Sequence, residues 1–492
     1  MHDIDNPTPV GIRGSWFIAA VFMAASALAA DEVPAVSPAQ LSPVKKSALE
    51  WIDKSSARSN DLSDRIWRAA ETSLKETQSA ELLAKELEKE GFKVKRGVAG
   101  MSTAFVAEYG SGKPVIGILA EFDALPGLSQ SATPTKQPFQ QGAAGHGCGH
   151  NLFGTASTAA AVAVKRAIVQ QKLQGTIRLY GTPAEENYSG KTYMVRDGLF
   201  NDVDIAFHWH PDSETGVPQA SSQALNGVEI TFSGQSAHAA GSPWTGRSAL
   251  DAVELLNVSM NYLREHVPLS SRIHYVITNG GAAPNIVPDR ASVWYMIRDT
   301  ERSGVERLHE RLLESIQGAA LMTRTTYEIK ILEAPWHVLV NEVGSRLMFS
   351  NLLAIGPPQF TADEQTFAKE IQRNLGIEQA GLASKIEPMR PPHPESGTTD
   401  VADVSWVTPT IGLTVATAVL GDPGHNWSTV ATGGMSIGHK GLNVAAKTMA
   451  ATALDILQDP SLLQPITAEW KQKTKGIVYK SAIPEGQKPP TP

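Results

Sequence analysis

The stretch Gly145-His146-Gly147-Cys148-Gly149-His150-Asn151 places the only cysteine of the 492-residue chain between two histidines and among glycines. Thiolate and imidazole are side-chain ligands of zinc-like ions. The glycines predict a turn, and the alanine-rich segment 152–170 predicts a helix directly after it. Since the start of a helix lowers the pKa of a nearby thiol, we expect Cys148 to be a metal-binding thiolate.

Further ligand candidates follow downstream, in Glu185-Glu186, His208-Trp209-His210 and His425. An adjacent pair of glutamates offers one carboxylate as a ligand and one as a general base. Either His208 or His210 can be the ligand, because both side chains lie on one face of an extended segment. This set of residues favours a metal-activated water that attacks a carbonyl group.

Two other interpretations of Cys148 remain open at this point. A lone cysteine often packs as a small hydrophobic residue. A cysteine with a neighbouring histidine can also be a nucleophile with its base. A chelator separates the last case from metal chemistry, because a thiol nucleophile does not need the ion.

Composition excludes several classes of protein. The chain has 43 Lys and Arg against 50 Asp and Glu, a net charge of −7, and lacks a basic run, which argues against nucleic-acid binding. Its 42% hydrophobic and 19% charged residues are typical of a globular enzyme. One cysteine excludes an internal disulfide.

The N-terminus has the pattern of an export signal. Arg13 precedes the apolar run from Trp16 to Ala25, and Ala27-Leu28-Ala29 is a cleavage signal. The run is shorter than the about 20 residues that span a bilayer. We therefore expect residues 1–30 to be a cleaved signal peptide and the mature chain to be periplasmic or secreted.

The first half of the chain predicts an α/β sheet. Expected strands at residues 104–109, 114–120, 176–181 and 203–209 alternate with helical segments, which favours a sheet covered by helices on both faces. Glu121, Glu185 and His208 each come near the end of an expected strand. Sites in such sheets form at the carboxyl ends of strands.

From residue 223 the pattern changes to that of a second unit. The expected order is strand 227–233, helix 248–266, strands 273–279 and 291–298, helix 305–322 and strand 326–332, which is the ferredoxin-like order. We expect an inserted α+β domain over 223–338. It would split a catalytic domain into 31–222 and 339–475, with 476–492 as a tail.

Eight segments carry a resemblance to a known family in the same order along the chain. They are E-F-D-A-L-P-G (121–127), G-H-G-C-G-H-N (145–151), G-T-P-A-E-E (181–186), H-W-H-P (208–211), S-A-H-A-A-x-S-P-W-x-G-R-S-A (236–249), G-G-A-A-P-N-I-V-P-D (280–289), T-T-D-V-A-D-V-S-W (398–406) and G-H-N-W (424–427). The set resembles the dinuclear-metal amidohydrolases related to aminoacylases and carboxypeptidases. Within these it is most similar to the subgroup that contains p-aminobenzoyl-glutamate hydrolase.

The resemblance implies a role for each matching residue. Cys148 would bridge two divalent ions, zinc or manganese, and Glu185 would be the general base. The inserted domain would act as a lid and form a homodimer. His238 would bind the oxyanion, and Asn285 and Arg298 would contact the substrate. The other implied metal ligands are His150, Glu186, His210 and His425.

The chain departs from the family pattern at two places. Asn151 stands where many relatives have aspartate, and Glu121-Phe122-Asp123 stands where they often have D-M-D. Asp123 is nevertheless placed to orient a ligand histidine from outside the metal sphere.

The expected reaction is hydrolysis of the amide bond of an N-acyl or N-aroyl amino acid. Two alternatives remain: a metallo-carboxypeptidase or dipeptidase acting on small peptides, and a catalytically silent partner or binding protein. The substrate is in each enzymatic case a small amide or dipeptide.

Overall fold

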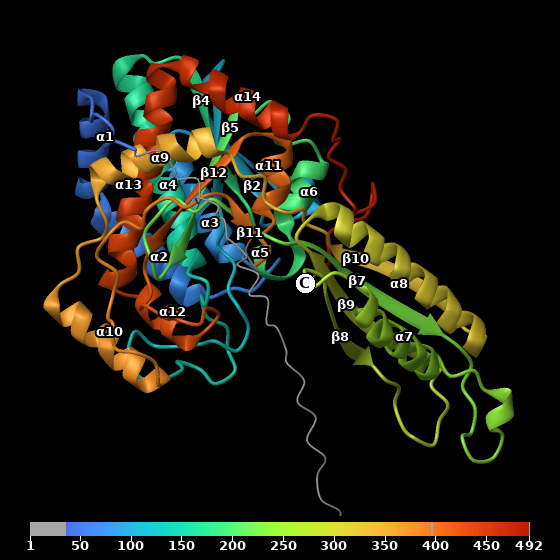
Figure 1. Ribbon diagram of the computed structural model, residues 1–492. Coiled ribbons are helices and arrows are strands. Elements are labelled where there is room, and N and C mark those ends of the chain that lie inside the picture. The colour runs from blue at the N-terminus through green and yellow to red at the C-terminus, as the bar shows by residue number, and fades with distance from the viewer. Residues whose placement is uncertain (1–35, 395–396, 492) are drawn as a thin grey trace, which may run out of the picture.

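The computed structural model describes residues 36–394 and 397–491 (Figure 1). The expected signal peptide, residues 1–30, lies outside the described residues. Two sheets of unequal size organise the described chain, and a parallel pair of short strands, β6 and β11, lies apart from them. The pair consists of β6 (Ala220–Ser221) and β11 (His393–Pro394).

The larger sheet has six strands and is mixed. Its strands, in spatial order, are β1 (Lys93–Arg96), β2 (Phe105–Ser111), β4 (Gly175–Gly181), β3 (Val115–Ala120), β5 (Ile205–Asp212) and β12 (Thr410–Ala416). β1, β2 and β4 pair antiparallel, whereas β4, β3, β5 and β12 are parallel. The sequence did not predict β1, because its residues Lys-Val-Lys-Arg are mostly charged, as is common on an edge strand.

Strand β3 shows why this sheet is covered on both faces. Every one of its residues is buried, and alternate side chains point to opposite faces. Ile116 and Ile118 belong to one apolar cluster, and Val115 and Leu119 belong to another. This confirms the α/β sheet with a buried central strand that the apolar run predicted.

Helices from both ends of the chain share the apolar cluster of the first of these faces, packing on the sheet directly or on one another. They are α1 (Pro43–Lys54), α2 (Ser56–Ala69), α3 (Thr77–Lys89), α4 (His150–Gln171), α9 (Glu342–Ile355), α13 (Ser436–Gln458) and α14 (Leu463–Lys473). Helix α4 is apolar enough to span a membrane by composition, but 83% of its most apolar window is buried in the protein. Core packing therefore accounts for its composition.

Further helices complete this part of the molecule. On the second face lie η1 (Val98–Gly100), α6 (Gly190–Arg196) and α11 (Val401–Val407). The others are α5 (Glu185–Tyr188), α10 (Ala362–Leu375), α12 (Trp427–Gly433) and η4 (Pro460–Leu462).

The smaller sheet has four antiparallel strands and its own apolar core. In spatial order they are β10 (Thr326–Glu333), β7 (Ala224–Ser233), β9 (Arg290–Asp299) and β8 (Arg272–Asn279). Helices α7 (Ala249–Leu263) and α8 (Arg302–Thr323) pack against it and against each other. The short helices η2 (Pro243–Thr245) and η3 (Arg264–His266) flank α7.

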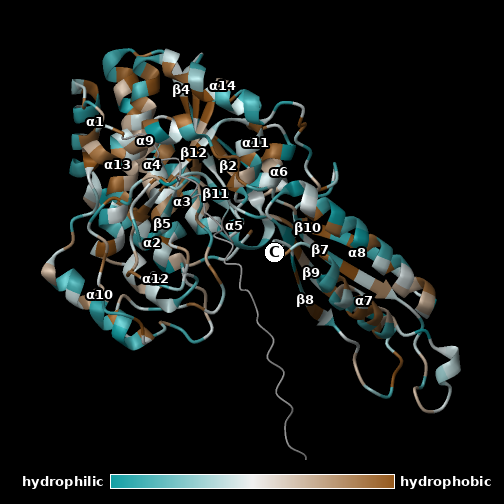
Figure 2. Cartoon of the chain, in the orientation of Figure 1, coloured by the Kyte–Doolittle hydropathy of each residue, from teal (hydrophilic) through white to brown (hydrophobic). Residues whose placement is uncertain are grey.

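This smaller sheet projects from the rest of the molecule (Figure 1). Helix α8 carries hydrophilic and hydrophobic bands, as expected for a helix with one face on a sheet (Figure 2). The order strand, helix, strand, strand, helix, strand agrees with the order expected for residues 223–338.

The C-terminal segment packs across the junction between the two sheets. The Tyr479 hydroxyl donates to Asp403 on α11 over 2.5 Å, and the Gln487 side chain donates to the Ile331 carbonyl of β10 over 2.6 Å. Ile483 is buried. Residues 476–492 were expected to be a tail, and the described part of this tail forms a strap over the junction.

Candidate active site

The candidate site lies where three neighbouring parallel strands of the larger sheet end. Glu121 directly follows β3, Glu185 follows β4 by four residues, and His210 lies in the last part of β5. Together with Cys148 they line a cavity of about 520 Å³. Sites in open α/β sheets form at this edge, and the sequence predicted this position.

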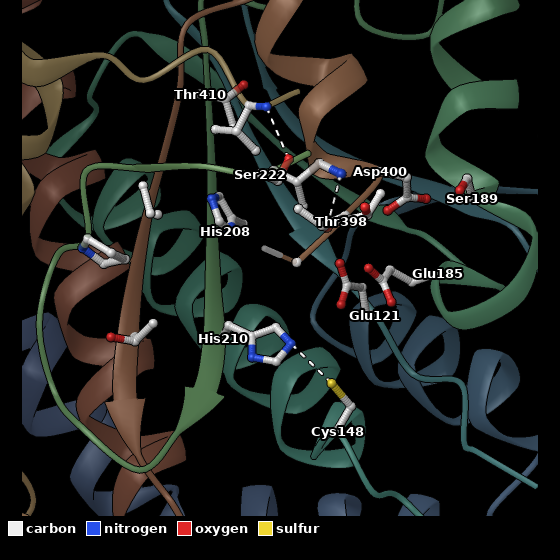
Figure 3. Close-up of a pocket in the computed structure, with 18 of the residues that line it drawn as sticks. Glu121, Cys148, Glu185, Ser189, His208, His210, Ser222, Thr398, Asp400 and Thr410 are labelled. Atoms are coloured by element: carbon white, nitrogen blue, oxygen red, sulfur yellow. Dashed lines mark hydrogen bonds between the residues drawn. The ribbon is translucent and has the colours of Figure 1, made fainter. Parts of the chain in front are cut away.

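The turn before α4 brings Cys148 to the site. Gly149 caps this helix with a φ of 73°, and a Cβ atom here would lie 2.8 Å from the Pro211 side chain. Only glycine combines this left-handed backbone with so close an approach. The turn leaves Cys148 Sγ 3.3 Å from Nε2 of His210 (Figure 3).

Asp123 lies against the ring of His150 and fixes its orientation. Its Oδ1 lies 2.9 Å from His150 Nδ1, and its Oδ2 accepts hydrogen bonds from the Ser73 hydroxyl and the Glu186 backbone N–H. Because Nδ1 faces this carboxylate, Nε2 of His150 is directed toward Cys148 and His210. Outer carboxylates commonly fix ligand histidines in this way.

Two groups of three donor atoms share Cys148. Within each group the donors lie within 4.8 Å of one another; the groups are Cys148, His150 and His210, and Cys148, Glu186 and His425. Glu186 Oε1 is buried and has no hydrogen-bond partner in the described part of the chain. His150 Nε2 is buried too and forms no hydrogen bond there, although it lies 3.1 Å from a Glu121 oxygen. Thiolate, imidazole and carboxylate are donors that would fit divalent cations in this arrangement.

The protein alone does not favour the Cys148 thiolate. Burial raises the pKa of the thiol, and the negative charge of Glu186 raises it further. In the protein alone the pKa of this thiol is therefore raised, opposite to the direction expected from the start of α4. A cation that binds Cys148 would supply the missing positive charge and release the proton.

Glu185 lies beside the donor groups at the start of the short helix α5. The residue before it, Ala184, has a φ of 62°, which turns the chain sharply after β4. Burial raises the pKa of Glu185, and the charges of Glu121 and Glu186 raise it further. A carboxyl that holds protons more strongly than usual is suited to general-base and general-acid work near neutral pH.

A buried lysine balances two of the carboxylates. Lys191 Nζ lies 2.7 Å from Glu121 Oε1 and 2.5 Å from Asp400 Oδ1, and its backbone N–H donates to Asp400 Oδ2. All three side chains are almost completely buried. The other oxygen of Glu121 lies 3.1 Å from His150 Nε2, so this group borders the donor atoms directly.

Of the remaining predicted residues, His425, Arg298 and His208 line the cavity, whereas His238 and Asn285 do not. His425 is 61% exposed and its Nε2 lies 3.4 Å from Glu186 Oε2. Arg298 lines the cavity, and so does His208. His210, rather than His208, lies within the donor group of Cys148.

His238 and Asn285 lie away from the cavity. Both are exposed, and the Ala239 backbone N–H donates to the Asn285 carbonyl over 3.0 Å. His238 Nδ1 accepts hydrogen bonds from the backbone N–H groups of Ala240 and Gly241, which leaves the proton on Nε2. Neither residue lines the cavity of its own chain.

Sequence reasoning missed Lys191 and Asp400, and it noted Glu121 at the end of an expected strand and as a departure from the family pattern without giving it a role. Asp400 lies within the segment 398–406 that carried the resemblance, and this was the one available signal.

His146, by contrast, belongs to the cysteine motif but not to a donor group. Its Nε2 lies 3.1 Å from the carbonyl of Ile66, and burial lowers its pKa to about 4.

Comparison with known proteins gives consistent matches. Residues 117–424 match the model of peptidase family M20/M25/M40. The chain is 41% identical to a p-aminobenzoyl-glutamate hydrolase chain of Escherichia coli, over 89% of this chain and 97% of the relative. It is 29% identical to the Xaa-Arg dipeptidase of Mus musculus, over 89% of this chain and 94% of the relative.

Solved structures agree on the fold. The structure of a dinuclear metal-binding peptidase of the M20 family from Bacillus subtilis superposes with a TM-score of 0.53 at 18% identity, and the match covers 82% of this chain and 99% of that one. The family model and the identity over nearly the full length decide the relationship. The chain belongs to peptidase family M20/M25/M40 and is a hydrolase of amide bonds.

Proposed function

We propose that this chain hydrolyses the amide bond between an acyl or aroyl group and an amino acid, with p-aminobenzoyl-glutamate as the model substrate. The observation that carries the proposal is the position of Glu185 in one cavity with Cys148 and with members of both donor groups, namely His210, Glu186 and His425. The 41% identity to the p-aminobenzoyl-glutamate hydrolase chain supports the substrate class.

Divalent ions, zinc or manganese, would be held by Cys148, His150, Glu186, His210 and His425. When bound, they would polarise the substrate carbonyl and lower the pKa of water at the site from about 15.7 toward 7. Thiolate and imidazole ligands favour zinc, and carboxylates are also compatible with manganese.

Glu185 would move the proton in the reaction. Its carboxylate would take a proton from the attacking water and return it to the amide nitrogen, which is a poor leaving group until it is protonated. Arg298, which lines the cavity, would bind a carboxylate of the substrate.

The four-stranded sheet would act as a lid and as the homodimer interface. Strand β8 lies at its edge, and Val276 and Ile277 on this strand are 55% and 40% exposed. Tyr262 on α7 is 72% exposed. A second copy bound here would cover these residues and would bring His238 and Asn285 to the neighbouring site, where His238 could stabilise the oxyanion.

The domain boundaries follow from this assignment. We assign 31–222 and 339–475 to the catalytic domain, 223–338 to the lid and 476–492 to the C-terminal segment. The pattern of residues 1–30 supports export to the periplasm or secretion.

A second candidate function is the hydrolysis of dipeptides. The observation that favours it is the 29% identity to the Xaa-Arg dipeptidase over most of both chains. Both functions use the same site and differ only in the group that carries the scissile carbonyl.

The test is product formation from p-aminobenzoyl-glutamate, a panel of N-acyl amino acids and a panel of dipeptides. The mature chain is assayed metal-free and after addition of zinc or manganese. Metal-dependent cleavage of the first two substrate types supports the main proposal, and cleavage of dipeptides alone supports the second. Cleavage that survives chelation would identify a cysteine hydrolase, and no cleavage with metal bound would identify a catalytically silent protein.

A further inference from the structure

A buried glutamate at the base of the four-stranded sheet faces the same cavity as the metal donors. Glu333 ends β10, is 4% exposed and lines the cavity together with Arg298. Its Oε2 accepts a hydrogen bond from the Ser189 hydroxyl over 3.3 Å. Its Oε1 is buried and has no hydrogen-bond partner among the described residues.

The strand register explains why this carboxyl group points toward Arg298. Glu333 pairs with Gly227 on β7, and Gly227 pairs with Met296 on β9. Arg298 lies two residues beyond Met296 and so on the same face of the sheet. A Cβ atom on Gly227 would lie 2.5 Å from Glu333 Cγ, so the glutamate side chain occupies the space that the glycine leaves open.

Arg298 is also incompletely bonded. One terminal nitrogen donates to the Thr398 hydroxyl over 3.2 Å, and its Nε is buried without a partner in the described chain. The described residues form no ion pair between Arg298 and Glu333. Burial raises the pKa of Glu333 to about 8, and the charge of Arg298 only partly opposes this rise. Arg298 and Glu333 thus present a cation and a carboxyl group to the cavity from the same face of the sheet, each with a free bonding position.

We propose that Arg298 and Glu333 form a two-point subsite for the amino-acid part of the substrate, in which Arg298 binds the carboxylate and Glu333 binds a basic nitrogen on the side chain. The inference rests on the proposed function for the reaction and narrows its amino-acid part, so p-aminobenzoyl-glutamate would be cleaved less well than its lysine analogue. Glu333 then sets specificity: it favours amino acids such as lysine, ornithine or arginine. An acidic side chain would meet a second negative charge.

The first experiment compares N-benzoyl-lysine, N-benzoyl-norleucine and N-benzoyl-glutamate as substrates of the metal-loaded enzyme. Norleucine has the length of lysine without its amine. We expect kcat/KM for the lysine compound to exceed that for norleucine by at least about tenfold, because a charged hydrogen bond in a buried site is lost. Equal values, or a preference for the glutamate compound, would overturn the subsite.

Variants of Glu333 give the second experiment. Glu333→Gln should bring the lysine-to-norleucine ratio close to one, and Glu333→Lys should reverse the preference in favour of glutamate. Glu364→Gln is the matched control, because Glu364 is 5% exposed but bonds Ser436 and Lys440 far from the cavity. If Glu333→Gln folds and its lysine-to-norleucine ratio of kcat/KM is unchanged, the proposal is overturned. If neither Glu333 variant folds, the comparison of the three substrates on the wild-type enzyme decides the proposal.

Binding separates this inference from the proposed function. Glu185→Gln, loaded with metal, is titrated calorimetrically with the same three compounds. If the wild type cleaves none of them but the variant binds the lysine compound at least about tenfold more tightly than norleucine, the subsite stands and the reaction is wrong. If the wild type cleaves all three and binding is equal, the reaction stands and the subsite is wrong.

Discussion

Nζ of Lys191 lies 2.7 Å from Oε1 of Glu121, and both side chains are 1% exposed or less. The same ammonium group lies 2.5 Å from Asp400. Burial raises the pKa of Asp400, and burial opposes the charged form of Lys191 as well, so each charge depends on the others. One lysine therefore holds two carboxylates next to the metal donors.

Replacing Lys191 with methionine should strongly destabilise the protein. The change leaves Glu121 and Asp400 buried without a cation, which typically costs about 3–5 kcal/mol. Denaturant unfolding of both proteins measures the loss. Lys54→Met is the control, because Lys54 is 78% exposed in its pair with Glu50 and should cost less than about 1 kcal/mol. If Lys191→Met and Lys54→Met lower the free energy of unfolding by the same amount, the role of Lys191 is contradicted.

Glu185→Gln should abolish most of the activity and leave the metal content unchanged. Glutamine keeps the shape of the side chain but cannot accept the proton, and a positioned general base contributes about 100- to 10,000-fold. The measurements are kcat on p-aminobenzoyl-glutamate and bound metal by mass spectrometry. Retained activity would show that another group moves the proton.

Removal of metal should reversibly abolish activity. Chelation followed by dialysis is expected to leave an inactive protein, and zinc or manganese should restore it. Cys148→Ala should weaken metal binding by at least about tenfold, because loss of an orienting outer residue alone costs that much. An enzyme that stays active after complete chelation would instead have Cys148 as its nucleophile.

Asp403 should make stability depend on pH. Burial raises its pKa to about 7 in the folded protein, from 3.8. Between these values the unfolded chain releases the proton while the folded chain keeps it, so stability falls as pH rises through this window. Asp403→Asn should remove up to about 1.4 kcal/mol per pH unit of that fall. The measurement is the free energy of unfolding at pH values between 3.8 and about 7. Asp61→Asn is the control, because the Asp61 side chain is 69% exposed.

The sequence predicted the strands and the donor residues best where the signal was local. Cys148 and His150 share one turn, and β3 is a continuous apolar run bounded by polar residues. Helices α2 and α3 are separated by a turn that contains Ala70 and Leu74, both with positive φ. Local periodicity does not register such a turn.

Lys191 and Glu333 could not be found from sequence for a different reason. Each is a single charged residue whose function depends on burial and on a partner far along the chain. Lys191 meets Asp400 across 209 positions, and Glu333 reaches the cavity only because Gly227 pairs with it. These relationships exist in the assembled sheets and leave no pattern in the surrounding residues.

The strap formed by the C-terminal segment has a consequence for biosynthesis. Tyr479 and Gln487, which bond the larger sheet's α11 and the smaller sheet's β10, are translated after every metal-donor residue. Both sheets therefore precede the strap in the order of synthesis, and this additional fastening between them can form only once the C-terminal segment has been made. A premature stop codon just before Tyr479 would leave every donor residue in the chain and the fastening missing.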